Sequence, residues 1–121
     1  MPSTRQRGRE WEQVAESLLR RHGLRTLTAN YQCRTGEIDL VMLDGAVLVF
    51  VEVRYRRSDR YGSGADSVTT AKQRRITRAA RHFLACHAQH AQRPSRFDVV
   101  SIGHGRNGPE LDWIRSAFDA G

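Results

Sequence analysis

The sequence predicts an α/β domain with a mixed central sheet flanked by helices, and three observations lead to this prediction. An amphipathic helix pattern opens the chain, two strand patterns joined by a tight turn follow it, and a second long helix pattern comes next. With a weaker strand before the hairpin and a last strand at Arg96–Ile102, the order is α-β-β-β-α-β. Alternating elements of this kind pack a sheet against helices around one core.

Size and charge narrow the class of protein. The 121 residues suffice for one domain, which we place at residues 9–121 after a basic, flexible tail at residues 1–8. Lys and Arg number 20 against 13 Asp and Glu, a formal net charge of +7, and such a surface attracts nucleic acid. No apolar run approaches the length of about 20 residues that a membrane helix needs, and no secretory signal is recognised. We therefore expect a cytoplasmic protein with a nucleic-acid partner and no membrane contact.

The first helix is expected at Arg9–His22 and ends at Gly23. Its apolar side chains recur at the i, i+3, i+4, i+7 and i+8 spacing of one helix face. They are Trp11, Val14, Ala15, Leu18 and Leu19. A weaker alternating pattern then predicts a short strand at Arg25–Cys33.

The two clearest strands are Gly36–Leu43 and Ala46–Tyr55. They are joined by Asp44-Gly45, a dipeptide suited to a two-residue hairpin turn because both positions tolerate positive φ. Such a turn sets Leu43 opposite Ala46, and this pair fixes the predicted register of the whole hairpin.

The predicted register gathers carboxylates on one face of the hairpin. Asp39 faces Phe50 and Glu37 faces Glu52, so Asp39 and Glu52 are diagonal neighbours about 7–8 Å apart. Arg54 lies two residues beyond Glu52 on the same face. Burying a carboxylate is costly unless a cation or hydrogen bonds compensate it. A half-exposed salt bridge between Glu52 and Arg54, worth about 0–1 kcal/mol, is the simpler alternative.

A hard divalent cation would relieve the repulsion between these carboxylates. Mg²⁺ prefers oxygen ligands, keeps several waters and can activate one of them to attack a phosphodiester. Glu12 sits on the border of the first helix's apolar stripe, from which it would reach the sheet edge and bind metal directly or through water. An ordinary solvated glutamate is the alternative interpretation of Glu12.

The second half of the chain contains its own loop, helix-start and helix-end patterns. The polar, glycine-rich stretch Arg56–Ser67, up to about residue 68, is expected to be a mobile loop. The capping-box pattern Thr70–Gln73 opens a long helix, and Pro94 follows that helix as a breaker. Its apolar stripe consists of Ile76, Ala79, Ala80, Phe83 and Leu84. After the last strand we expect a turn at His104–Pro109 and a short strand or helix at Leu111–Phe118.

Basic residues of this helix and loop are candidate phosphate contacts. Lys72 and Gln73 continue the core-facing stripe at the first turn of the helix, where a lysine would hold a phosphate. An outward arginine stripe and the loop arginines would track a nucleic-acid backbone without reading its sequence. They are Arg74, Arg78, Arg81, Arg56, Arg57 and Arg60. A solvated basic face is the alternative interpretation of the stripe.

Several motifs resemble the bacterial YraN family, in order over about Gly8–Phe118. They are Gly8-x-x-x-Glu12-x-x-Ala15-x-x-x-Leu19, Asn30, Gly36-Glu37-Ile38-Asp39-Leu40, Val49-Phe50-Val51-Glu52-Val53-Arg54, Lys72-Gln73 and Arg96-Phe97-Asp98-Val99-Val100. The resemblance implies a restriction-endonuclease-like fold, similar to that of archaeal Holliday junction resolvases. In that superfamily an acidic residue on one strand and an acidic-x-lysine motif on the next bind Mg²⁺, often with a helix glutamate.

The resemblance also assigns roles to individual residues. Asp39, Glu52 and Glu12 match the acidic metal-binding positions, and Val53 would lend its backbone carbonyl to the metal. Arg54 matches the lysine position, but arginine neutralises a phosphate without acting as a general base. Lys72 would then supply the missing ammonium group as a migrated active-site lysine.

The leading hypothesis is therefore an endonuclease that depends on Mg²⁺ or Mn²⁺ and acts on structured or branched DNA. The first alternative is a non-catalytic module that binds nucleic acid in DNA or RNA repair or processing. The second is a protein-interaction adaptor whose basic surface is incidental. Junction resolvases use two symmetry-related sites, which leaves a homodimer open.

Overall fold

The computed structural model describes residues 4–56 and 68–120, with side chains from residue 8 onward. Its elements are α1 (Thr4–Arg21), β1 (Arg25–Cys33), β2 (Gly36–Asp44), β3 (Val47–Tyr55), α2 (Thr70–Cys86), the short 3-10 helix η3 (Ala88–His90), β4 (Ser95–Gly105) and β5 (Gly108–Phe118). The predicted α/β class is confirmed, and the closing element is a fifth strand.

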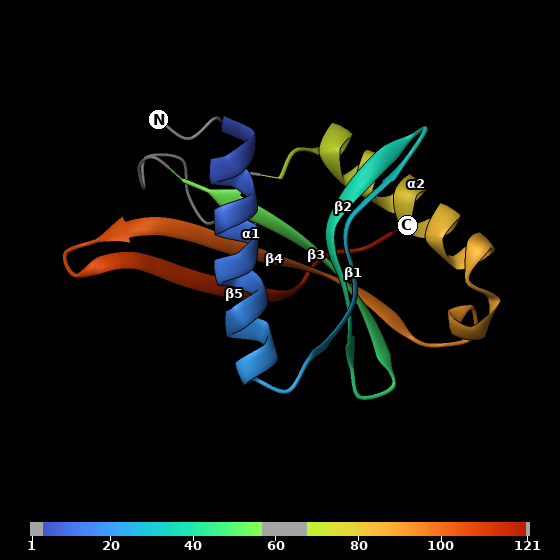
Figure 1. The fold of residues 1–121 in the computed structure, drawn as a ribbon. Coiled ribbons are helices and arrows are strands. Elements are labelled where there is room, and N and C mark those ends of the chain that lie inside the picture. Colours follow the sequence, from blue (N-terminus) through green and yellow to red (C-terminus); the bar gives the residue numbers. More distant parts are fainter. Residues whose placement is uncertain (1–3, 57–67, 121) are drawn as a thin grey trace.

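The five strands form one mixed sheet in the order β1-β2-β3-β4-β5. Neighbouring strands are antiparallel except for β3 and β4, which run parallel and are connected through α2. In Figure 1, α1 lies across the sheet and α2 lies at its other side, beside the end of the β1–β2 hairpin. This mixed sheet with two helices is consistent with a restriction-endonuclease-like core.

Alternation along β3 divides the apolar core into two layers. Leu48 and Phe50 are buried in the cluster that includes α2, whereas Val49 and Val51 are buried in the cluster that includes α1. The predicted stripe of α2 supplies the buried residues Ile76, Ala79, Ala80 and Phe83 and the partly buried Leu84. By the same alternation, Glu52 belongs to the α2 side of the sheet.

Element boundaries differ from the prediction at both ends of the chain. Helix α1 begins at Thr4, so residues 4–8 of the expected flexible tail are helical. The turn predicted at His104–Pro109 is shorter, because β4 runs to Gly105 and β5 starts at Gly108. The closing element at Leu111–Phe118 is part of β5, where backbone pairing with β4 outweighs a weak local pattern.

The hairpin turn is also shifted by one residue. Asp44 and Val47 are cross-strand partners, so the two turn residues are Gly45 and Ala46 rather than Asp44 and Gly45. Gly45 takes the positive φ of 59° that the turn needs, which costs a glycine little. Asp44 stays in the strand.

The N-cap of α2 is one residue earlier than predicted. The Thr69 hydroxyl, rather than that of Thr70, accepts a hydrogen bond from the Lys72 backbone N–H at 3.2 Å. Gln73 does not return to a cap amide; its side chain donates to the Val68 carbonyl at 3.0 Å. Gln73 therefore braces the segment that leads into α2.

Two further expectations concern the loop and membranes. The predicted mobile loop, including Arg57 and Arg60, lies outside the described residues, apart from Arg56 at its start. Within the described part of the chain, no helix is long and apolar enough to cross a bilayer.

Candidate active site

The candidate site lies where β2 and β3 stop pairing. The ladder between these strands ends at the pair Leu40 and Val51. Beyond this pair, a side chain replaces the backbone acceptor of β2: Asp39 Oδ2 accepts a hydrogen bond from the Val53 backbone N–H at 2.8 Å. A side chain thus satisfies the main chain at the fork, and the two strands separate around it.

The observed register brings two acidic residues level with each other. Continued by one residue, it sets Asp39 opposite Glu52, so the prediction that Asp39 faces Phe50 is wrong by two residues. A shift of two preserves the face of every side chain, and Asp39 and Glu52 still share one face. Glu37 does not face Glu52 as predicted; it pairs with Gln32 of β1.

Glu52 is the most deeply buried acid of the site, with 4% of its surface exposed. The pKa of Glu52 is raised to about 8; burial is the largest cause, and the negative charge of Asp39 is the second. Lys72 lowers the pKa, because its Nζ lies 2.8 Å from Glu52 Oε1. Lys72 is itself partly exposed and comes from the first turn of α2. One cation therefore compensates only part of the cost of burying Glu52.

The pKa of Asp39 is also raised, to about 6. Burial is the main cause, opposed by the hydrogen bond from the Val53 N–H and followed by the charge of Glu12. A hydrogen bond between the two carboxyl groups lowers the pKa of Asp39 and raises that of Glu52. This pattern is expected when Glu52 holds the proton and donates to Asp39.

Glu12 completes the row of carboxyl groups from the α1 side. Burial raises its pKa, hydrogen bonds with Asp39 and Asn30 lower it, and the charges of Glu52 and Glu37 raise it. Asn30 reaches Glu12 from β1, where its backbone takes a positive φ of 54°, a conformation that asparagine tolerates better than most residues. Glu12 is therefore a half-buried member of the site.

The donor set suits a hard divalent cation better than a transition metal. All its donors are carboxylate or amide oxygens. Burial first, and neighbouring acids second, raise the pKa values of Asp39 and Glu52, and Lys72 offsets only part of this rise. The acids form a row of pairs: within the described ranges no three His, Cys, Asp or Glu residues converge as a ready-made metal cage. Mg²⁺ fits such a row, because proteins often hold it with one or two carboxylates and several waters.

The remaining predicted site residues have mixed positions. Arg54 is half-buried on β3, level with Ser101 of β4. Arg56 follows β3, and its backbone N–H donates to the Ile102 carbonyl at 2.8 Å. Gln73 is occupied with the Val68 carbonyl. The predicted outward stripe of α2 is exposed and lines a hollow of about 380 Å³ with the C-terminal residues; it consists of Arg74, Arg78 and Arg81.

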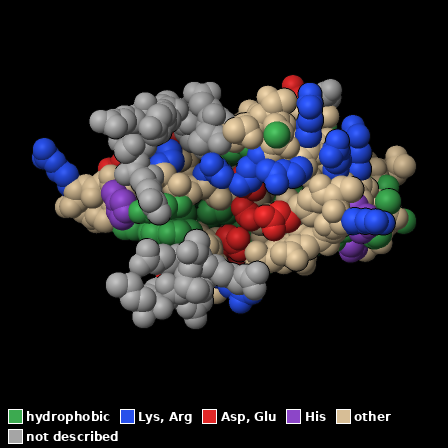
Figure 2. Space-filling view, turned by 90° about the horizontal axis from the view of Figure 1, so that it is seen from above, with side chains coloured by type: hydrophobic (Ala, Val, Ile, Leu, Met, Phe, Trp, Pro, Cys, Tyr) green, Lys and Arg blue, Asp and Glu red, His purple; other side chains and the backbone are tan. Residues whose placement is uncertain are grey.

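Two hollows flank the end of the β1–β2 hairpin. The carboxylate pocket, of about 420 Å³, is lined by Gly8, Arg9, Glu12, Asn30, Gln32, Glu37 and Asp39. A second hollow, of about 490 Å³, lies between the hairpin end and α2 and shares Gln32 and Glu37 with the first. Figure 2 shows acidic side chains gathered in the middle of this face, with Lys and Arg side chains beside them.

Sequence reasoning assigned no role to two residues that shape the site. Asn30 was noted only as part of the family resemblance, because its contact with Glu12 depends on the positive φ that its backbone takes inside β1. Gly36 fits against α2: a Cβ there would lie 2.2 Å from the Arg75 carbonyl oxygen. A glycine inside a strand pattern indicates a close approach of another backbone, so the sequence pattern alone could have indicated this contact.

Comparisons with known proteins agree on one family. The profile described as "Uncharacterised protein family UPF0102" matches residues 11–102. A UPF0102 protein of Pseudomonas aeruginosa strain LESB58 is 49% identical over 120 residues, covering 98% of this chain and 96% of that protein. A UPF0102 protein of Nitrosomonas europaea is 49% identical over 119 residues, covering 98% of each. One from Aeromonas hydrophila is 48% identical over 118 residues, covering 97% and 88%.

Proposed function

The chain belongs to the UPF0102 family, which is the YraN family, and from its site we propose that it is a Mg²⁺-dependent endonuclease acting on structured or branched DNA. The observation that carries this proposal is the acid pair at the fork of β2 and β3, the buried Glu52 and the half-buried Asp39. Buried acids with raised pKa values in a lined pocket are more frequent at reactive sites than elsewhere. The preference for branched DNA rests on the resemblance to junction resolvases.

The proposed roles follow from position. Asp39 and Glu52 would bind the metal, with Val53 contributing its carbonyl and Glu12 assisting from α1. When bound, Mg²⁺ would lower the pKa of a water and polarise the scissile phosphate. Asn30 would orient Glu12 through their hydrogen bond.

The basic residues would hold the nucleic acid. Lys72 and Arg54 would place positive charge beside the scissile phosphate and stabilise the charge that develops on it, with Gln73 fixing the start of α2. The exposed stripe on α2 would contact the backbone phosphates. The stripe residues are Arg74, Arg78 and Arg81. Arg56 would extend these contacts, as would Arg57 and Arg60 outside the described residues.

A second candidate function is a non-catalytic nucleic-acid-binding module of DNA or RNA repair or processing. Two observations favour it. Arg54 stands where the superfamily has a lysine, and arginine is no general base. In addition, the described acids form pairs rather than a converging group of three, and Lys72 already neutralises Glu52 in part.

A cleavage screen separates these candidates. Purified protein is incubated with linear, flapped and four-way DNA in Mg²⁺ or Mn²⁺, with Glu52→Gln as the matched variant. The proposal predicts metal-dependent nicking of at least one branched substrate by the wild type and none by Glu52→Gln. Cleavage that persists in Glu52→Gln would point to a contaminating nuclease.

Calorimetric titration with Mn²⁺ gives an independent measurement. The wild type should bind the ion, and the double variant Asp39→Asn/Glu52→Gln should not. Absence of both binding and cleavage in the wild type would reject the enzyme and leave the binding module.

A further inference from the structure

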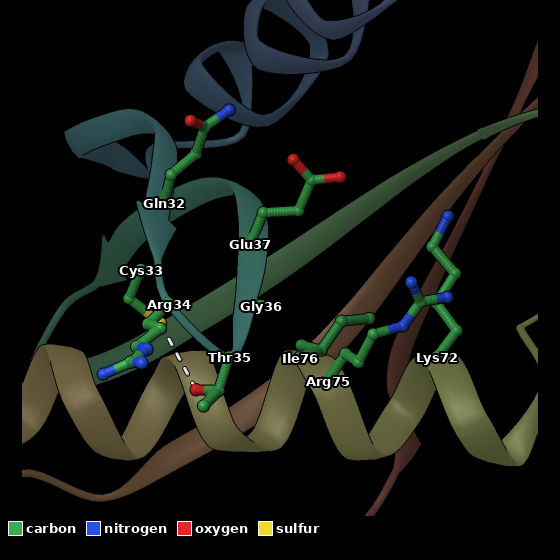
Figure 3. A pocket seen from close by; sticks show the side chains of 9 residues that line it. All are labelled: Gln32, Cys33, Arg34, Thr35, Gly36, Glu37, Lys72, Arg75 and Ile76. Carbon is green, nitrogen blue, oxygen red and sulfur yellow. Dashed lines mark hydrogen bonds between the residues drawn. The ribbon is translucent and has the colours of Figure 1, made fainter.

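The hollow between the β1–β2 hairpin end and α2, here named the hairpin cleft, adjoins the proposed metal site and shares Lys72 with it. It measures about 490 Å³, which is within the size range of small-ligand sites. Figure 3 shows that its walls come from two elements, the turn around Thr35 on one side and the first two turns of α2 on the other.

The close fit of Gly36 against α2 defines the wall of the cleft. A Cβ at Gly36 would meet three backbone atoms of Arg75, the nearest at 2.2 Å. Because the helix backbone touches the strand here, the hairpin end and α2 are held together without an intervening side chain. The Arg75 side chain is thereby left to lie along the cleft.

Two cations of α2 point the same way in the cleft. Lys72 and Arg75 are three residues apart and so lie on one helix face, and the Arg75 guanidinium ends beside the Lys72 side chain (Figure 3). Lys72 is paired with Glu52, whereas Arg75 makes no hydrogen bond or ion pair with any described residue. Arg34, on the far rim, points away from Arg75 (Figure 3).

Because Lys72 is already paired with Glu52, the positive charge available to an anion in the cleft is mainly that of Arg75. Glu37 marks the border, since it lines both the hairpin cleft and the carboxylate pocket. The carboxylate side attracts cations, and the side of Arg75 attracts anions. A chain of regularly spaced phosphates that crosses this border would place one phosphate at the metal site and a neighbouring one beside Arg75.

We propose that the hairpin cleft is a phosphate subsite in which Arg75 binds the nucleic-acid phosphate next to the scissile one, which Lys72 faces. This inference rests on the proposed function for its ligand. Arg75 is a binding residue here, with a planar fork of donors that matches a phosphate. The strand would pass from the carboxylate pocket over Gln32 and Glu37 into the cleft.

The test compares Arg75→Gln with Arg21→Gln, which removes the same charge from the exposed last turn of α1. Fluorescence anisotropy measures binding of a labelled 20-nucleotide single strand and of a labelled four-way junction, in EDTA, from low to physiological salt. We expect Arg75→Gln to weaken binding about five- to tenfold and to reduce the salt slope by about one phosphate contact. We expect Arg21→Gln to stay within about twofold.

Equal losses in the two variants, or no loss in Arg75→Gln, would overturn the subsite. Both variants should melt within a few degrees of the wild type, because both side chains are exposed. Arg75→Lys serves as the second variant: it keeps the charge but loses the fork, and should recover part of the affinity.

Metal-dependent cleavage is measured separately on the same substrates. Binding that depends on Arg75 without cleavage would keep the subsite and reject the enzyme. Cleavage with binding that ignores Arg75 would keep the enzyme and reject the subsite.

Discussion

Two buried acids on neighbouring strands, Asp98 of β4 and Glu52 of β3, have opposite surroundings. Asp98 is fully buried, yet hydrogen bonds reach it from three sides. Its carboxylate accepts from Arg96 Nε at 3.0 and 3.1 Å, from Trp113 Nε1 at 2.9 Å and from the Ser116 backbone N–H at 3.0 Å. Such a carboxylate is a structural anchor, which ties β4 to the irregular end of β5.

Glu52 is nearly as deeply buried but much less well compensated. Among the described residues its ion pair is with Lys72 alone, and burial, followed by the charge of its acidic neighbour Asp39, raises its pKa. Burial is therefore no mark of function by itself. The difference lies in the compensation of the buried charge: three groups donate hydrogen bonds to Asp98, whereas Glu52 has one cation beside it and an acid as its other neighbour, as a site for an incoming cation requires.

Removing the charge of Asp98 should have the largest effect. Asp98→Asn keeps the shape but weakens the bond to Arg96 and turns amide hydrogens toward the N–H donors that Asp98 now accepts from. We expect a loss of about 3 kcal/mol in the free energy of unfolding, measured by urea denaturation at pH 7. A loss below about 1 kcal/mol would show that the Asp98 network is no anchor.

Removing the charge of Glu52 should increase the free energy of unfolding instead of lowering it. The pKa of Glu52 is about 8 in the folded chain and near 4.5 when unfolded. The folded state therefore holds more protons than the unfolded state between these values, and stability falls as pH rises through the window. Glu52→Gln removes this penalty, and we expect it to stabilise the metal-free protein at pH 8.5 by about 2 kcal/mol.

Urea denaturation at pH 6.5 and 8.5 checks both the sign and the cause. The metal-free wild type should lose stability over this interval, while Glu52→Gln should stay nearly constant. Asp39, with a pKa of about 6, contributes mainly below the interval. A wild type whose stability does not change between the two values would mean that Glu52 is already ionised at pH 6.5.

Bound Mg²⁺ should also compensate the charge of Glu52 and thereby stabilise the folded protein. A ligand that binds only the folded state at ten times its dissociation constant adds about 1.4 kcal/mol. We expect Mg²⁺ to raise the melting temperature of the wild type at pH 8, and to raise it less at pH 6, where protons compete with the ion for the carboxylates. Ca²⁺ serves as the second oxygen-seeking ion, and Asp39→Asn/Glu52→Gln as the control that should not respond.

The sequence predicts on which face of the strand each site residue lies, but not which residue of the neighbouring strand lies opposite it. Side chains alternate with a period of two, so Asp39 and Glu52 share a face whether the register is the predicted one or the observed one. The level depends on which residues make the turn. Asp44 stays in β2 with an ion pair to Arg96 at 3.0 Å, a distant contact that a dipeptide pattern does not contain.

Contacts between distant elements account for the other gaps. Lys72 was recognised from its place on the helix face, but not its pairing with Glu52, because that contact depends on how α2 docks on the sheet. The FDVV motif helped to identify the family, yet the role of its aspartate depends on Trp113 of the next strand. Local patterns locate such residues, and tertiary docking chooses their partners.

The smallest effect on stability should come from Lys72→Met. This variant tests directly how the compensation of Glu52 differs from that of Asp98. Lys72 lowers the pKa of Glu52, so its loss should move that pKa upward, as measured by carboxyl-carbon NMR of Glu52. At pH 5, where Glu52 is protonated with or without Lys72, stability should change by less than about 0.5 kcal/mol. Trp113→Phe is the matched loss of one partner at Asp98.

The Trp113→Phe variant should cost about 1 kcal/mol, because Asp98 loses one hydrogen-bond donor but keeps those from Arg96 and from the Ser116 backbone N–H. A cost of Lys72→Met that grows as pH rises would mark Glu52 as an acid that awaits a cation, in contrast to Asp98, whose hydrogen-bond donors already satisfy it. If Lys72→Met left the titration of Glu52 unchanged, the ion pair would carry no weight, and the surplus charge would have to be ascribed to Asp39 and burial alone.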